Sequence, residues 1–174
     1  QVVKIAKVAE DVQIPYLQAD SREDVDAFLG FRHVTGIKEW HPAEKAEYIS
    51  KLIDDRKMGY EEVMRKIGSK TQSVRQNYIA YRLLKQMEER DEISLKKVEG
   101  KFSVLYLSLR TDGVKKYLDI NIKADPKAAR RPVPSKRMKE LVNFARWLFG
   151  DDDNLPMVSD SRYVDKFGEI LESP

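Results

Sequence analysis

A single glycine between two short amphipathic segments limits most strongly how this chain can fold. Gly68 follows Tyr60–Ile67, whose apolar residues recur at helical spacing, and precedes a longer helical pattern. Glycine adopts the left-handed backbone that most residues avoid, so it permits a tight turn between two helices. The spacing therefore predicts a helix-turn-helix over about residues 60–84. Its two helices are expected to meet at Val63, Ile67 and Val74.

The second helix of this motif is predicted to begin at a capping box, Ser69-Lys70-Thr71-Gln72. In a helix-turn-helix, the N-terminal part of the second helix enters the major groove, where Arg, Gln and Thr side chains pair with base edges. The predicted base-reading residues are Lys70, Thr71, Gln72, Arg75 and Gln76. Phosphate contacts are predicted for Ser69, Ser73, Arg82 and Lys85 and, upstream, for Arg32 and Lys38.

The basic residues are concentrated in two runs. Arg65 to Met87 holds six basic residues and no acidic one, and Lys123 to Lys139 holds seven against the single Asp125. The net charge is only +3, so the positive field is local, and such a field attracts polyanions. An isolated basic run is usually a solvated face. The first run, however, contains the predicted motif, so double-stranded DNA is the predicted partner.

Composition excludes several other classes of protein. The 174 residues include no cysteine, which rules out a disulfide scaffold and thiolate catalysis. No apolar run reaches the roughly 18 residues that a membrane span needs, and no signal peptide is visible at the start. We expect no membrane partner, no cofactor and a cytoplasmic, nucleoid-associated location. A homodimer is a further expectation, because helix-turn-helix proteins commonly read two half-sites.

The predicted fold is mainly α, with at most a short β remnant at Gln13–Ala19, near the N-terminus. Phe102–Leu109 is compatible with a strand or a buried helix, and Asp125–Pro134, with three prolines, is predicted to be an extended basic linker. Further helices are predicted from Ser21 to Gly30, from Pro42 with Ala46, Ile49, Leu52 and Ile53 inward, over 114–120, over 135–149 and over 161–172. Three regions follow: 1–40 as a junction, 41–90 as the helix-turn-helix domain, and 91–174 as a helical C-terminal segment with the basic linker 123–139.

Residues 41–84 resemble the central part of ParB-type partition proteins. His41-Pro42-Ala43-Glu44-Lys45-Ala46 is similar to that family's Asn-Pro-x-Glu-x-Ala helix start. Glu61-Glu62-Val63 through Ile67-Gly68-Ser69 resembles its helix-turn-helix, which closes on a pair such as Leu83-Leu84. The resemblance implies DNA binding in partition, regulation, or DNA modification and defence. Residues 31–40 then stand where the family's nucleotide-binding domain meets its DNA-binding domain.

Other parts of the family pattern do not match. The Arg-rich phosphate box would lie before residue 1, the Asn-x-x-Arg box is not recognisable, and the region after Arg90 differs from the family's dimerising tail. CTP binding therefore does not carry over. An alternative is the DNA-binding part of a ParB-like nucleotide hydrolase or nuclease whose catalytic domain precedes residue 1. A helical protein-interaction adaptor is a third possibility.

Two clusters of polar residues elsewhere in the sequence contain side chains that can bind metals. His33, Glu39 and His41 fit no standard metal-ligand spacing, and Asp151-Asp152-Asp153 is typical of a solvated loop. No metal site and no catalytic residues are therefore predicted.

Overall fold

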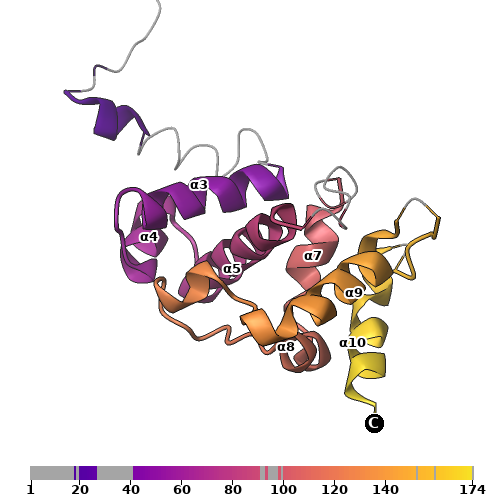
Figure 1. The fold of residues 1–174 in the computed structure, drawn as a ribbon. Coiled ribbons are helices and arrows are strands. Elements are labelled where there is room, and N and C mark those ends of the chain that lie inside the picture. Colours follow the sequence, from indigo (N-terminus) through magenta and orange to yellow (C-terminus); the bar gives the residue numbers. More distant parts are fainter. Residues whose placement is uncertain are drawn as a thin grey trace, which may run out of the picture.

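The computed structural model describes residues 18, 20–26, 41–90, 93, 98, 100–151, 153–158 and 160–173. Over these residues the chain is mainly helical, as predicted, and contains no strand (Figure 1). The predicted β remnant lies, except for Gln18, outside the described residues. Residues 22–26 form a helical turn, and the Asp24 backbone N–H donates to Ser21 Oγ at 3.1 Å, which agrees with the predicted helix start at Ser21.

Three helices form the first half of the described chain: α3 (Pro42–Asp54), α4 (Tyr60–Ile67) and α5 (Thr71–Glu88). Helix α3 begins as predicted, with Pro42 in its first turn and the His41 backbone N–H donating to Glu44 Oε2 at 3.3 Å. Its predicted inner face is confirmed, because Ala46, Ile49, Leu52 and Ile53 are all buried. In Figure 1, α3 runs across α5, and α4 lies at one end of the pair.

The turn between α4 and α5 is made as the sequence predicts. Gly68 has φ 63° and ψ 37°, in the left-handed region, and its N–H donates to the Met64 carbonyl. The residues expected between the helices, Val63, Ile67 and Val74, are fully buried. The predicted capping box is wrong. Lys70, rather than Ser69, is the N-cap of α5, and no side chain caps its first turn.

Among the described residues after α5, the second half contains four more helices, with short 3₁₀ turns before α9 and α10. The ambiguous segment is a helix, α7 (Phe102–Ser108), and α8 (Asp112–Leu118) begins with the Thr111 hydroxyl accepting the Val114 N–H. The remaining elements are η1 (Ala128–Arg130), η2 (Ser135–Arg137), α9 (Met138–Phe149), η3 (Ser161–Tyr163) and α10 (Val164–Glu172). The helix predicted over 114–120 begins two residues earlier than expected, so Gly113 lies inside α8. A Cβ there would come within 1.9 Å of the Gly168 carbonyl oxygen, so glycine lets α8 and α10 cross closely.

One hydrophobic core runs through both halves. It includes Leu83 and Met87 of α5 together with Leu105 of α7 and Phe144 of α9, all fully buried. The C-terminal helices thus pack directly on the helix-turn-helix, and burial of this shared apolar surface stabilises both halves together. Figure 1 shows α7 and α9 beside the C-terminal half of α5.

Residues 121–134, which we call the basic strap, do not form the extended linker that the prolines suggested. The strap folds into turns and η1 and packs along α5, with Ala129 and Val133 buried. Gln86, itself buried, donates to the Val133 carbonyl and accepts the Val133 N–H, both at 2.9 Å. A reciprocal pair of buried hydrogen bonds fixes the strap to α5 because either group would be costly to leave unpaired.

Candidate nucleic-acid interface

The first turn of α5, which holds the predicted base-reading residues, is partly exposed to solvent. Lys70 and Gln72 are exposed, and Ser69 and Thr71 are half-buried. The Thr71 hydroxyl donates to the Met64 sulfur at 3.1 Å, so its polar group is directed at α4. Lys70 takes part in no ion pair with any described residue. The Lys70 ammonium group and the Gln72 amide at the start of the helix therefore have no polar partner among the described residues.

Arg75, one turn further along, is held against an aromatic ring. Its guanidinium carbon lies 5.2 Å from the centroid of the Tyr60 ring, which in turn meets the Tyr78 ring edge-on at 6.0 Å. Such a cation–π contact restricts the orientation of the guanidinium without neutralising its charge. Arg75 Nε is buried and has no hydrogen-bond partner among the described residues. The side chain is half-buried, so its outer end is the part left for a ligand.

Burial also changes the acidity of the tyrosines below Arg75. Burial raises the pKa of Tyr60 to about 12, against an opposing effect of the Arg75 charge. The pKa of Tyr78 is raised more, by burial and by its hydrogen bond to Asp54. Both rings are thus neutral at physiological pH, and the Tyr60 ring offers Arg75 an uncharged aromatic surface.

Two of the predicted contact residues face the protein interior instead. Gln76 is only 7% exposed, and its Nε2 donates to the Tyr106 carbonyl of α7 at 2.8 Å. Ser73 is half-buried, and both its carbonyl and its hydroxyl accept hydrogen bonds from Asn77 Nδ2. Helical spacing placed Gln76 on the outer face because the sequence does not reveal that α7 covers that side of α5. Its burial removes it from the candidate interface.

Two residues predicted to contact phosphate, Arg82 and Lys85 in the second half of α5, lie beside acidic side chains of this chain. Arg82 lies 3.8 Å from an Asp54 carboxylate oxygen and donates from Nε to the Arg130 carbonyl at 3.0 Å. Lys85 pairs with Glu88 at 2.8 Å. Both cations lie beside an acid and are partly covered, which distinguishes them from Lys70.

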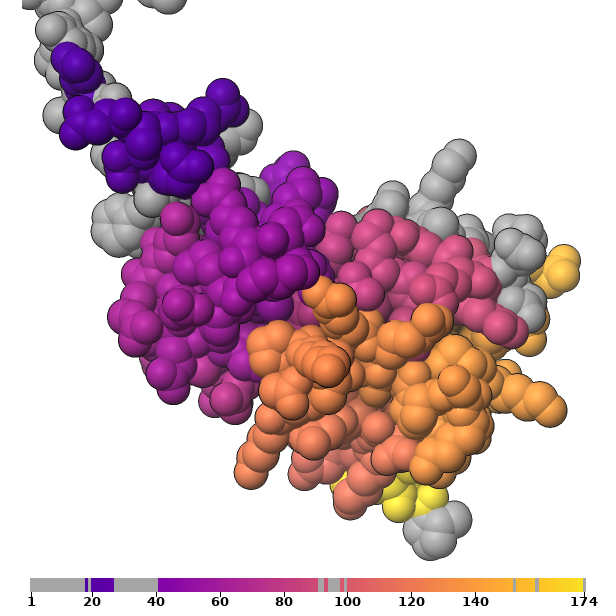
Figure 2. Space-filling view, turned by 60° about the vertical axis from the view of Figure 1, so that its left-hand side comes forward, coloured from indigo at the N-terminus to yellow at the C-terminus, as the bar shows by residue number. Residues whose placement is uncertain are grey.

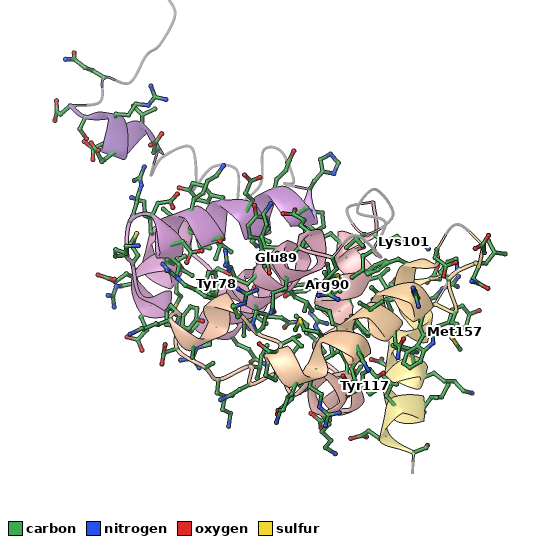
Figure 3. All side chains as sticks on the ribbon, in the orientation of Figure 1. Tyr78, Glu89, Arg90, Lys101, Tyr117 and Met157 are labelled. Atoms are coloured by element: carbon green, nitrogen blue, oxygen red, sulfur yellow. The ribbon has the colours of Figure 1, made fainter. Side chains whose placement is uncertain are left out.

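Asp54 is the centre of this polar network. Its Oδ1 accepts hydrogen bonds from the Tyr78 hydroxyl at 2.8 Å and from Arg130 Nε at 3.1 Å, and its Oδ2 accepts one from Ser50. Figure 3 shows Tyr78 in the interior, between α3 and the part of the chain that contains η1. One carboxylate therefore connects α3, α5 and the strap.

The last turn of α4 adds two cations that the motif pattern did not single out. Arg65 is exposed, Lys66 is half-buried, and neither pairs with an acid in the described part of the chain. They precede the Gly68 turn, so they lie on the same connection as Lys70. Arg82 differs from them by its tertiary contact with Asp54 of α3, and Lys85 differs by its local pair with Glu88, three residues further along α5.

Some of the residues considered in the sequence lie outside the described residues or in other parts of the fold. Arg32, Lys38, His33 and Glu39 lie outside the described residues. Asp151 Oδ1 accepts hydrogen bonds from Asp153 and Asn154, as in a closed turn. Within the described ranges, no cluster of three or more His, Asp or Glu residues has the arrangement of a metal site.

Comparison with models of known protein families, with curated proteins and with solved structures gave no match. The described residues define a mainly helical protein with a helix-turn-helix connection in its first half. None of its described helices has the length and apolarity to cross a lipid bilayer.

Proposed function

We propose that this chain binds double-stranded DNA with the first turn of α5 in the major groove. The division of the basic run is the observation that carries the proposal. Arg65, Lys66 and Lys70 around the turn pair with no described acid, whereas Arg82 lies beside Asp54, which it shares with Arg130, and Lys85 pairs with Glu88. Free cations gathered at a helix-turn-helix connection suit a ligand with regularly spaced phosphates.

Within this proposal the side chains have separate tasks. Gln72 is exposed and reads a base edge, and the outer end of Arg75 pairs with guanine from its position above Tyr60. Lys70 and Lys66 contact the phosphates that border the groove, with Ser69 beside them. The ParB-like sequence pattern of residues 41–84 agrees with this arrangement, and a place with the nucleoid in the cytoplasm would follow from it.

A binding titration with matched variants tests the proposal. The unmodified chain is expected to bind a short duplex at about 50 mM salt, with an affinity that falls steeply as salt rises. Lys70→Gln should lower the slope of log Kd against log salt by about one. Lys166→Gln removes a charge from an exposed position of α10 and is expected to leave the slope unchanged.

Base reading is tested separately by selection from a pool of random duplexes. Gln72→Ala should relax the preference at one base pair, at a cost of about 1–3 kcal/mol, without changing the salt slope. Gln72 is the cleaner choice because Arg75→Ala would also remove the contact with Tyr60. Absence of duplex binding by the unmodified chain at about 50 mM salt would overturn the proposed function.

A further inference from the structure

The basic strap is fixed beside the helix-turn-helix. The Tyr78 hydroxyl donates to the Pro126 carbonyl at 3.2 Å, and Arg130 reaches Asp54 at the end of α3. Together with the reciprocal hydrogen bonds between Gln86 and Val133, these contacts hold the strap at several points along α5. Figure 2 shows the orange surface around residues 125–140 directly against the violet surface of α3 and α4.

The start of the strap lies next to the start of α4. Pro126, Lys127 and Arg130 line a pocket of about 370 Å³ together with Met58 and Gly59, the residues just before α4. Asp125 lies near enough to Tyr60 to affect its acidity, and Tyr60 is the ring on which Arg75 rests. This end of the strap is therefore a neighbour of the surface proposed to read DNA.

The charges of the strap divide in the same way as those of the first basic run. Arg130 pairs with Asp54, and Arg131 pairs with Glu89. Lys123 and Lys127 are exposed and pair with no acid among the described residues. The nearby Asp125 carboxylate is occupied, because its Oδ1 accepts the N–H groups of Lys127 and Ala128 at 2.9 and 3.0 Å.

We propose that the start of the basic strap is a second, preformed DNA-backbone contact, in which Lys123 and Lys127 bind phosphates flanking the groove that α5 enters. The inference rests on the proposed function and adds a separate element to it. Because hydrogen bonds at Pro126 and Val133 already fix the strap, the backbone that carries its lysines is in place before DNA arrives, which reduces the entropy lost on binding. The contact is with phosphate alone, so it adds affinity without sequence preference.

The test compares two double variants that remove the same charge. Lys123→Gln/Lys127→Gln should lower the slope of log Kd against log salt by about two, and reduce the loss of affinity between about 50 and 200 mM salt by roughly tenfold. Lys139→Gln/Lys166→Gln removes two exposed lysines of α9 and α10 that pair with no described acid, and it should leave the slope unchanged. Lys123→Arg/Lys127→Arg keeps both charges and should retain the original slope.

A positional readout separates the strap from general electrostatics. Ethylation of individual phosphates should interfere with binding both inside and beside the major-groove site, and the Lys123→Gln/Lys127→Gln variant should lose only the flanking interference. Equal slopes for the two double variants, with the Lys70→Gln effect retained, would overturn the strap contact and leave the proposed function in place. If the unmodified chain binds no duplex, both proposals fail.

Discussion

At the scale of single residues, Tyr60 combines a buried ring with an unused hydroxyl. Its side chain is 6% exposed, and its Oη has no hydrogen-bond partner among the described residues. The ring packs on Tyr78 and supports Arg75, so its contribution comes from the aromatic surface. Removal of the hydroxyl therefore leaves no partner unsatisfied.

This environment predicts a specific alkaline response. The folded pKa of Tyr60 is about 12 against the ordinary value of 10.0. A raised pKa means that the stabilisation is fully present below pH 10 and is lost as the pH rises toward 12, because the unfolded chain ionises first. Tyr60→Phe should match the parent at pH 7 and lose less unfolding free energy between pH 10 and 12.

Urea denaturation at a series of pH values measures this effect. Tyr163→Phe is the matched control, because Tyr163 is 54% exposed. If Tyr60→Phe and Tyr163→Phe show the same dependence of unfolding free energy on pH, burial does not raise the pKa of the Tyr60 hydroxyl.

At the scale of elements, the α4–α5 connection depends on the conformation of one residue. Gly68 is held at φ 63°, where a residue with a Cβ is strained by about 1–2 kcal/mol. Gly68→Ala should lower the free energy of unfolding by about that amount. Gly59→Ala is the control, since Gly59 has φ −74° and a Cβ there would make ordinary contacts. If denaturation shows the same loss of unfolding free energy for both variants, the turn at Gly68 does not require a glycine.

Helix α5 also shows which features local sequence patterns predict. The Gly68 turn was predicted from one residue type, and the inner face of α3 was predicted from apolar residues that recur every three or four positions, so both depend on local sequence alone. The burial of Gln76 depends on Tyr106, thirty positions away, and the engagement of Arg82 depends on Arg130, forty-eight positions away. Similarly, the three prolines predicted an extended linker, but buried hydrogen bonds between Gln86 and Val133 hold that segment on α5. Contacts at such separations leave no periodic signal, so a single sequence does not reveal them.

At the scale of the whole molecule, the shared core predicts that the two halves unfold together. Phe144 of α9 is fully buried in the same cluster as Leu83 and Met87 of α5. Phe144→Ala should lower the free energy of unfolding by about 3–5 kcal/mol. Amide hydrogen exchange should show this loss in the slowest amides of both α5 and α9. A loss confined to α9 would mean that the helix-turn-helix is stable without the C-terminal helices.

The coverage of α5 by other elements has a consequence for the length of DNA that one chain can recognise. Gln76 of α5 is held by α7 and Gln86 by the strap, so the stretch before the first of these contacts consists of the N-cap Lys70 and the helical residues up to Arg75, about 9 Å at the helical rise per residue. Successive base pairs are about 3.4 Å apart, so under the proposed function one copy reads roughly three of them. A DNA sequence of about three base pairs recurs throughout any genome. Recognition of one particular genomic site would therefore require at least two chains bound at a fixed spacing.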